Sequence, residues 1–415
     1  MEQSTGNENL ESKPSDIDFH DLETLLQQGL GNNELKVIDH QTKYLLPAGE
    51  NYSSLVVKLD ATICRKDDAE KEILHLVAKA RIPNDEYLDS WILGFKKEVF
   101  AYTELLPIYK DIEVEAGIPE NELIDIIPKY TGHRNSFKNN SEIDKDSLIL
   151  MENMKMKGYY NCDRHTGLDL EHATIAFTSL AKYHALGIAM MQKRPSFAQI
   201  AMRISETKFV DQSVVEAYDT VRKAFHKYSS LAVYIDLIEA SITYMIDKLF
   251  SQEIRPVRLW DAISHGDFWT NNILFHKNDQ NRVDDVKFVD WALYFRISVL
   301  ADLPYFLCTS IQRTVLDDHF DDLLNLYYDT FIRTLERVGC DTTMFTRKSF
   351  DAELKKQAIN ELAMCALAIK FIHYQVEKKD EENRQLHKNV FESENDNYEV
   401  SLLRIIEIYQ RRKWL

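Results

Sequence analysis

Residues 264–275 read SHGDFWTNNILF, and this stretch can form either an ordinary turn or a catalytic loop. His265, Gly266 and Asp267 stand just before an apolar segment, and Asn272 follows Asp267 by five residues. An Asp and an Asn at this spacing can simply bond to nearby backbone within a turn. The same spacing occurs in phosphoryl-transfer loops, where the Asp accepts the proton of the attacking hydroxyl and the Asn binds magnesium.

A second Asp favours the catalytic interpretation. The phosphoryl-transfer template needs another Asp on a neighbouring strand as a further metal ligand. The segment VKFVDWA (286–292) supplies Asp290, eighteen residues after Asn272. The sequence therefore predicts Asp267 as the base or hydroxyl-orienting group and Asn272 and Asp290 as magnesium ligands.

The composition is that of a globular chain. It has 415 residues, of which 45% are hydrophobic, enough for one large domain or two lobes with a real core. The formal net charge of −17 argues against nucleic acid and anionic membranes as partners. The amino terminus lacks a basic segment followed by an apolar one, and no apolar stretch reaches the roughly 20 residues of a spanning helix. The five cysteines are scattered without a CxxC pair, which favours a reducing compartment, so we expect a cytoplasmic protein.

Hydrophobic periodicity divides the chain into a strand-rich part and a helical part. Residues 1–18 are polar and acidic and are expected to form a flexible tail. Strands are expected at 52–64, 72–82, 125–132 and 147–154, with one helix at 88–109. Helices are expected at 170–191 and 350–379, and NILFH (272–276) and VDDVKFVDWALYF (283–295) are expected to hold two short strands. This order predicts an α+β fold with a β-rich lobe at 19–152 and a mainly helical lobe at 153–415 that carries the opening motif.

The loop and the strand after it resemble one family. HGDFWTNN, followed by VKFVDWALYF, resembles the HGDxWxxN element of the insect ecdysteroid-kinase-like family, also called CHK-kinase-like. That family belongs to the protein-kinase-like superfamily of aminoglycoside and choline phosphotransferases. The resemblance runs from about residue 45 to about residue 310 and implies a two-lobed protein-kinase-like fold that uses ATP and Mg²⁺. It implies that the lobe at 19–152 binds the nucleotide and that the lobe at 153–415 carries the catalytic loop and the acceptor site. One departure is Ala292, where the family more often has Gln, so a contact beside the metal ligand is in doubt.

The resemblance also implies a set of nucleotide-binding residues in the first lobe. AGENYSS (48–54) stands where the family has its phosphate-covering loop, whose backbone N–H groups and hydroxyls would bind phosphate oxygens. Lys79 in LHLVAKA would face the α- and β-phosphates, and Glu98 on the following helix would hold it. LILMENM is similar to the connection between lobes, where adenine meets backbone groups. The implied cofactor-binding residues are Gly49, Asn51, Ser53, Ser54, Lys79, Glu152, Asn153 and Met154, with Lys79 and Glu98 also counted as catalytic.

Simpler structural roles compete for several of these residues. Lys79 could be an edge-strand lysine with a solvated tip, and residues 152–154 could be a plain strand end. His184 in LAKYHA is expected to be a hydrogen-bonded core histidine and His265 a structural hydrogen bonder. Asp302 in ADLPYF fits a helix cap or a brace for the catalytic loop.

Two classes of function remain open. The first is an ATP-dependent kinase that transfers the γ-phosphoryl group to an alcohol hydroxyl of a small molecule; by resemblance the acceptor is an ecdysteroid, with a choline-like or xenobiotic alcohol as the alternative. The second is a catalytically inactive kinase-like protein that holds a nucleotide or a hydrophobic ligand. Inactive members usually lose the base, a metal ligand or the lysine, and all four residues are present here. The first class is therefore the leading hypothesis.

Overall fold

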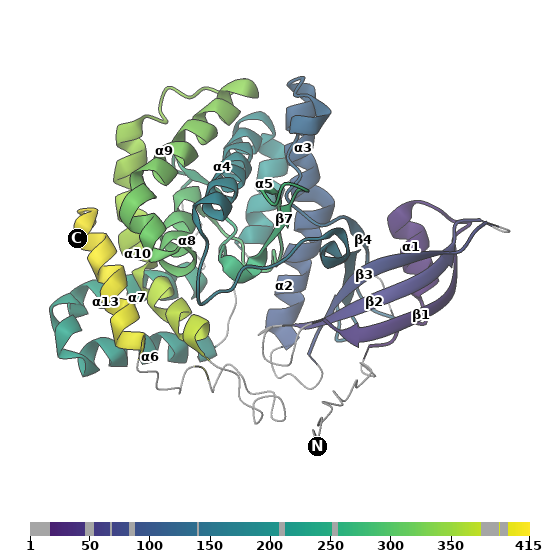
Figure 1. The fold of residues 1–415 in the computed structure, drawn as a ribbon, viewed down its shortest axis with the longest axis horizontal. Coiled ribbons are helices and arrows are strands. Elements are labelled where there is room, and N and C mark those ends of the chain that lie inside the picture. Colours follow the sequence, from purple (N-terminus) through teal and green to yellow (C-terminus); the bar gives the residue numbers. More distant parts are fainter. Residues whose placement is uncertain are drawn as a thin grey trace, which may run out of the picture. The chain divides into compact units, whose positions relative to one another are not determined.

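The computed structural model describes residues 17–45, 54–66, 69–82, 88–138, 141–206, 212–250, 256–374, 390 and 397–415 (Figure 1). An antiparallel sheet dominates the amino-terminal part and helices dominate the remainder, which confirms the expected α+β class. The tail expected at residues 1–18 lies outside the described residues up to residue 16.

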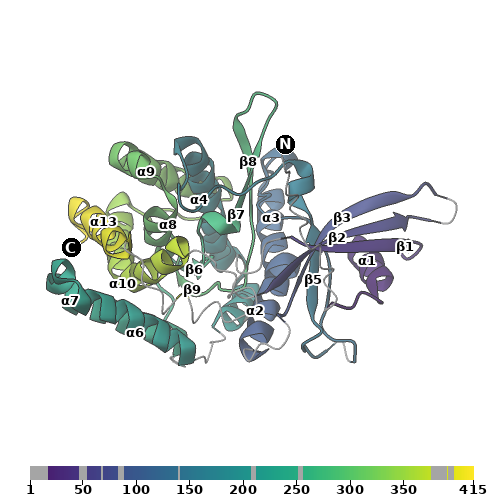
Figure 2. The same ribbon diagram turned by 60° about the horizontal axis from the view of Figure 1, so that its bottom comes forward.

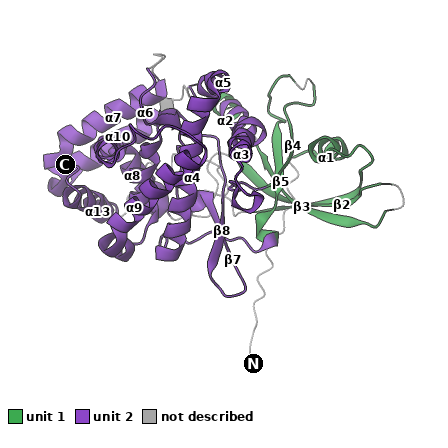
Figure 3. Ribbon diagram, turned by 90° about the horizontal axis from the view of Figure 1, so that it is seen from above, with its two compact units in different colours: residues 1–91, 129–156 green, residues 92–128, 157–415 purple. Residues whose placement is uncertain are grey.

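Two compact units share the chain (Figure 3). Unit 1 contains residues 1–91 and 129–156, and unit 2 contains residues 92–128 and 157–415. The units are interleaved along the sequence, because residues 92–128 cluster with the helical unit. The two lobes expected from the sequence, 19–152 and 153–415, therefore stay a prediction.

Unit 1 is a five-stranded antiparallel sheet covered on one face by a helix. The strand order is β1-β2-β3-β5-β4. The strands are β1 (Lys36–Tyr44), β2 (Leu55–Cys64), β3 (Glu72–Ala80), β4 (Tyr130–Arg134) and β5 (Leu148–Glu152), and the helix is α1 (Leu22–Leu30). Leu22, Leu25 and Leu26 recur at helical spacing and are buried, and α1 ends at Gly31, whose φ of 63° is the left-handed conformation that favours glycine.

The alternation along β2 and β3 gives the sheet two different faces. Val57, Leu59, Leu76 and Ala78 belong to the apolar core that also contains the α1 leucines. Neighbouring residues of a strand point to opposite faces, so Lys79 lies on the face away from α1. Lys79 is opposite Val56 of β2 and Ile149 of β5 in the strand register.

Unit 2 is built mainly from helices. Figures 1 and 2 show its helices and the short strands among them. The helices are α2 (Leu88–Phe100, from residue 92), α3 (Leu106–Glu115), α4 (Leu170–Lys193), α5 (Pro195–Ser205), α6 (Gln212–Lys227), α7 (Ile235–Phe250), α8 (Asp302–Ser310), α9 (Arg313–Arg337), α10 (Arg347–His373) and α13 (Asn397–Arg411). The strands form two antiparallel pairs, β6 (Asp261–Ile263) with β9 (Arg296–Ser298) and β7 (Ile273–Lys277) with β8 (Val283–Phe288).

Helix α4 forms the centre of unit 2. Asp169 caps its first turn by accepting a hydrogen bond from the backbone N–H of His172. Ala173, Phe177, Leu180 and His184 follow at helical spacing and are all buried. The helix packs against α9, as Figure 1 shows. This packing buries His184, the histidine expected in the core.

Several expected boundaries were wrong for identifiable reasons. The helix expected at 88–109 is α2, a π-helical turn at Ala101–Leu105, and α3 to Glu115. It continues past Pro107 through the π-helical turn, a local change of hydrogen-bond pattern of the kind that occurs where a helix accommodates an interruption. The strand expected at 125–132 begins only at Tyr130, because Asp125 and Ile126 bond to β8 instead: their carbonyl oxygens accept from Lys287 Nζ at 2.7 Å and Phe288 N at 2.5 Å.

One helical stretch, Ser229–Phe250, is long and apolar enough to cross a membrane by length and composition, with a mean hydropathy of 1.3. A stretch of this length and apolar character is not expected from the sequence. Its buried residues include Ile238, Ile242 and Met245, and Lys248 Nζ lies 3.0 Å from Oε1 of Glu361 on α10. The core helix of a globular unit passes the same test of length and composition, so the stretch is weak evidence for a membrane span.

Candidate active site

The loop between β6 and β7 carries the histidine, glycine and aspartate of the opening motif. Ser264 N donates to the carbonyl oxygen of Phe295 at 3.0 Å, which extends the β6–β9 pairing into the loop. Gly266 has a φ of 80°, and a Cβ atom on it would lie 2.2 Å from the carbonyl oxygen of Leu293. Only glycine fits this position, because a side chain would be both strained and blocked.

Asp302, the first residue of α8, holds the backbone of this loop. Its Oδ2 accepts from His265 N at 2.7 Å and its Oδ1 accepts from Gly266 N at 3.0 Å. His184 Nε2 lies 3.0 Å from the same Oδ2, and its Nδ1 lies 2.8 Å from the hydroxyl of Tyr327. Burial alone would raise the pKa of Asp302, but the hydrogen bond and charge of His184 outweigh it, so the pKa is lowered. Asp302 is thus the expected brace and His184 a hydrogen-bonded core residue.

His265 is unsuited to act as a base. Its ring is buried and lies 4.6 Å from the ring of Trp291 and 5.5 Å from that of Phe268, centroid to centroid. Burial lowers the pKa of His265 to about 4, against an opposing effect of the Asp302 charge. The neutral ring therefore supports the loop rather than exchanging protons near neutral pH.

Asp267 has hydrogen-bond donors on both of its carboxylate oxygens. The hydroxyl of Tyr305 donates to Oδ1 at 2.9 Å and Nδ2 of Asn272 donates to Oδ2 at 2.9 Å. Burial and then the negative charge of Asp290 raise the pKa of Asp267 to about 6, while hydrogen bonds from Tyr305, Asn272 and Trp269 oppose the rise. A pKa close to physiological pH suits a group that accepts a proton during a reaction.

Asn272 and Asp290 are brought together by the pairing of β7 with β8. Ile273 is opposite Phe288, and Val289 N donates to the carbonyl oxygen of Asn272 at 3.0 Å. Asp290 adopts the left-handed conformation, with a φ of 64°. Aspartate and asparagine are among the few residues other than glycine that tolerate this conformation. The three loop residues predicted from sequence thus lie in one site within unit 2.

The donor atoms of this site suit a hard cation. Nδ2 of Asn272 is used to bond Asp267, and among the described residues no hydrogen bond reaches its Oδ1. Magnesium takes oxygen ligands and usually keeps several waters, with only one or two carboxylates from the protein. No group of three or more His, Cys, Asp or Glu residues that could hold a metal occurs in the described part of the chain. One carboxylate from Asp290 and one amide oxygen from Asn272 therefore fit magnesium better than zinc.

Glu98 lies near the Asp290 end of this site. Helix α2 is fixed to unit 2 by Lys97, whose buried Nζ donates to the carbonyl oxygens of Ser205 at 3.3 Å and Tyr294 at 3.1 Å. Burial and then the negative charges of Glu98 and Asp290 raise the pKa of the Tyr102 phenol well above its usual value. Both carboxylates are therefore close to the same phenol, which lies one turn after Glu98 in the π-helical segment Ala101–Leu105 that continues α2.

Helix α2 also explains the small residue Ala292, two positions after the proposed metal ligand Asp290. A Cβ atom on Gly94 of α2 would lie 3.2 Å from Cβ of Ala292. The backbone of α2 therefore passes Ala292 closely, one turn before Glu98. The departure from the family pattern at Ala292 coincides with this close approach.

The other predicted residues belong to unit 1. Lys79 of β3 is buried, with 6% of its surface exposed, and Ser54 is buried at the start of β2. Asn153 N donates to the carbonyl oxygen of His75 at 2.9 Å, and Oδ1 of Asn153 accepts from Lys155 N at 3.1 Å. Glu152 ends β5, and Met154 opens a short 3₁₀ turn. Gly49, Asn51 and Ser53 lie outside the described residues.

The pairing of Lys79 with Glu98 joins residues of different units and stays a prediction. Both side chains are buried, with exposed fractions of 6% and 2%. A buried lysine and a buried glutamate each need compensating charge or hydrogen bonds. The nucleotide-binding assignment of the unit 1 residues likewise stays a prediction.

Sequence reasoning missed the contribution of α8 beyond Asp302. Tyr305 donates to Asp267, and Ser310 Oγ accepts from Thr270 N at 3.0 Å. Tyr305 stands three residues after Asp302 in ADLPYF, so both lie on the same face of a helix. That spacing was the available signal for Tyr305.

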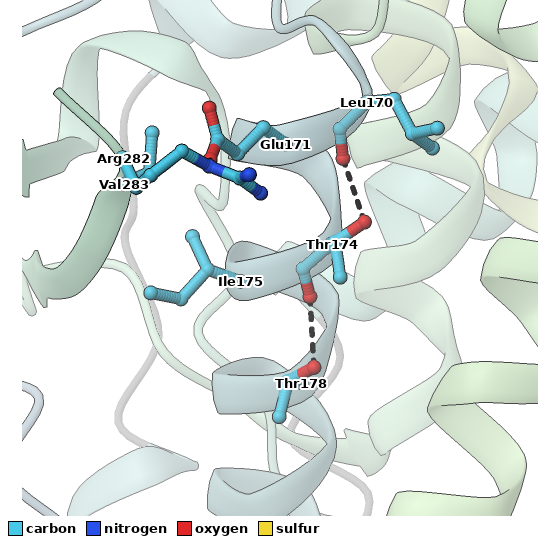
Figure 4. A pocket seen from close by; sticks show the side chains of 7 residues that line it. All are labelled: Leu170, Glu171, Thr174, Ile175, Thr178, Arg282 and Val283. Atoms are coloured by element: carbon cyan, nitrogen blue, oxygen red, sulfur yellow. Dashed lines mark hydrogen bonds and ion pairs between the residues drawn. The ribbon is translucent and has the colours of Figure 1, made fainter. Parts of the chain in front are cut away.

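A surface cavity of unit 2 lies away from these residues. It has a volume of about 770 Å³ and is lined by Leu170, Glu171, Thr174, Ile175, Thr178, Arg282 and Val283 (Figure 4). Glu171 and His184 are thirteen residues apart on α4, about 20 Å along an α-helix. The cavity therefore lies about 20 Å along α4 from His184, the residue that contacts Asp302 and so the Asp267 loop, and it is no part of the candidate active site.

A comparison with models of known protein families shows to which family the chain belongs. The ecdysteroid kinase-like family matches residues 48–340, most of the chain and all of the candidate active site. The chain belongs to the ecdysteroid kinase-like family. The family inferred from the sequence is thereby confirmed, and residues 264–275 and 286–292 of this family member lie within the matched region. A search of curated proteins finds no match.

Solved structures give weaker likenesses to this family member. An ethanolamine kinase from Plasmodium vivax is 11% identical, with 91% of this chain and 85% of that chain covered and a TM-score of 0.41. APH(2")-IIa, in a ternary complex with streptomycin and ATP, is 12% identical, with 88% of this chain and 96% of that chain covered and a TM-score of 0.37. A choline/ethanolamine kinase family protein from Mesorhizobium loti is 13% identical, covers 86% and 88%, and has a TM-score of 0.34. TM-scores below 0.5 do not identify a function.

Proposed function

We propose that this family member transfers the γ-phosphoryl group of ATP to an alcohol hydroxyl of a small molecule. The observation that carries the proposal is the site made by Asp267, Asn272 and Asp290. Asp267 is held by two hydrogen bonds, from Tyr305 and Asn272, next to the two oxygen donors predicted to bind magnesium. Protein kinases use the same three residue types, an Asp for the acceptor hydroxyl and an Asn and an Asp for magnesium, in phosphoryl transfer to a hydroxyl.

Each residue has a distinct role in the proposed reaction. Asp267 orients the acceptor hydroxyl and receives its proton as the oxygen attacks the γ-phosphorus of ATP, while the bond from that phosphorus to the bridging β-phosphate oxygen breaks and ADP leaves. Asn272 and Asp290 hold magnesium, which when bound neutralises the charge on the phosphates. Lys79, positioned by Glu98, binds the phosphate oxygens. Ser54, with Gly49, Asn51 and Ser53, covers the phosphates, and Glu152, Asn153 and Met154 contact the adenine.

The family supports an ecdysteroid hydroxyl as the first acceptor to test. A choline-like or xenobiotic alcohol is the alternative acceptor. An inactive nucleotide-binding protein is the alternative function, and the presence of Asp267, Asn272, Asp290 and Lys79 argues against it. We also propose a cytoplasmic location, with which five free thiols are compatible.

The test is a screen for ATP consumption by the purified full-length protein. Ecdysteroids, choline-like alcohols and xenobiotic alcohols are offered separately with Mg²⁺, and products are identified by mass. We expect at least one alcohol to gain the mass of a phosphoryl group in an amount equal to the ADP formed. ATP binding without any phosphorylated product across the panel would favour the inactive binder.

A further inference from the structure

Helix α8 contacts the catalytic loop along its length, and the contacts occur in the same order in both segments. Asp302, at its start, accepts from the N–H groups of His265 and Gly266. The ring of Phe306 lies 4.7 Å from that of Phe268, and Ser310, at its end, accepts from Thr270 N. Successive residues of α8 thus contact successive residues of the loop, and these contacts hold the loop against the helix.

Tyr305 is the residue of α8 that contacts the side chain of Asp267. Its hydroxyl donates to Oδ1 of Asp267 at 2.9 Å, and only 5% of the residue is exposed. The carboxylate torsion of aspartate is intrinsically broad. Asn272 holds Oδ2, so donors on both oxygens fix the plane of the carboxylate.

We propose that Tyr305 is a positioning residue for the reaction: its hydroxyl holds Oδ1 of Asp267 so that the carboxylate meets the acceptor hydroxyl in one orientation. The inference rests on the proposed function, because it assigns the orientation of the base in that reaction. A helix-borne phenol suits this role, since its ring is held by packing and its hydroxyl is the only polar group. Burial and then the charge of Asp267 raise the pKa of Tyr305 well above its usual value, so the hydroxyl keeps its proton and remains a donor.

The first variant is Tyr305→Phe, which removes one oxygen and keeps the ring. We expect kcat to fall about 10- to 100-fold, because a small misplacement of a catalytic group has an effect of that size. The KM for ATP should stay within about twofold, since Tyr305 bonds only Asp267 among the candidate site residues. Rates are expressed per ATP-binding molecule, measured by calorimetry, so that partial misfolding does not imitate the effect.

The matched control is Tyr398→Phe. Tyr398 is also 5% exposed, and its hydroxyl donates at 2.9 Å to the carbonyl oxygen of Ala366 on α10, not to a residue of the loop. Loss of this buried hydroxyl should lower thermal stability to a similar degree and leave kcat unchanged. A fall in kcat in both variants would mean that any buried phenol matters, which would overturn the inference.

A double variant decides whether Tyr305 acts through Asp267. In the Asp267→Asn background, Tyr305→Phe should reduce kcat little further, because residues that act as a unit are not additive. Additive losses, or a parent-like kcat in Tyr305→Phe alone, would overturn the positioning role while leaving the proposed function intact. A parent protein that phosphorylates no alcohol would overturn both.

Discussion

Nδ2 of Asn272 lies 2.9 Å from both the carbonyl oxygen and Oδ2 of Asp267. One side chain thus joins the proposed base to the proposed metal site. Since the amide nitrogen is used by Asp267, the amide oxygen is the atom that Asn272 can offer to a cation. The five-residue spacing in the sequence has this physical meaning: it allows the 3₁₀ turn at Thr270–Asn272 to bring the amide back to the aspartate.

Asp290→Asn should remove magnesium-dependent nucleotide binding while the fold persists. Asparagine tolerates the φ of 64° at this position and has the same size, so only the charge is lost. We expect the affinity gained for ATP on adding Mg²⁺ to fall at least about tenfold, as for other changes at metal sites. Titration calorimetry with and without Mg²⁺ measures the difference.

The control for this charge change is Asn281→Asp, at a position with a φ of 59° in the exposed turn between β7 and β8. It should leave ATP binding unchanged. Parent-like magnesium dependence in Asp290→Asn would remove Asp290 from the metal site.

Gly266→Ala should destabilise the protein strongly. A left-handed conformation costs a non-glycine residue about 1–2 kcal/mol, and the new Cβ would also lie 2.2 Å from the carbonyl oxygen of Leu293. Gly117→Ala is the matched control, because Gly117 has a φ of 74° and nothing within 4 Å of the added atom. Urea unfolding should show a clearly larger loss for Gly266→Ala, and equal losses would mean that the loop can move away from Leu293.

The catalytic loop was predictable because its chemistry is local in sequence. Asp267 and Asn272 are bonded to each other, and Asp290 follows them on the next strand of the same hairpin. The strands β2 and β3 and the helix α4 were also predictable, since each has a clear period of buried residues.

Long-range packing was not predictable in the same way. Residues 125–128 have a strand-like sequence, but the carbonyl groups of Asp125 and Ile126 bond to Lys287 and Phe288 of β8, more than 150 residues away. The assignment of α2 to the helical unit depends on Lys97, which is buried against carbonyl groups of Ser205 and Tyr294. A charged residue in an amphipathic helix gives no sign of such a contact until the partners are known.

The brace at Asp302 should depend on pH. The pKa of Asp302 is lowered in the folded protein, so its contribution to stability is present above the unfolded pKa, near 3.8, and is lost as pH falls through the folded pKa. At pH 7, Asp302→Asn should cost about 2–4 kcal/mol, because hydrogen bonds from His184 and two loop N–H groups lose a charged acceptor. Urea unfolding at pH 7, 5 and 3.5 should show the gap between parent and variant narrowing only at the lowest pH. A gap that stays constant down to pH 3.5 would refute the charged brace.

Lys79 and Glu98 should act as a unit. Replacing either with Met should lower kcat/KM for ATP, and the double replacement should cost little more than the worse single one. Single-turnover and steady-state rates of the three variants provide the comparison. Strictly additive losses in activation free energy would show that the two residues do not pair.

The most direct test of the proposed reaction is Asp267→Asn. Asparagine keeps the size of the side chain and removes the charge that receives the acceptor proton, while ATP is held by other groups. The kcat for the phosphorylated alcohol should fall by about 10²- to 10⁴-fold, with the calorimetric affinity for ATP and Mg²⁺ nearly unchanged. A folded Asp267→Asn protein that forms phosphorylated product at the parent rate would contradict the role of Asp267 and, with it, the proposed mechanism.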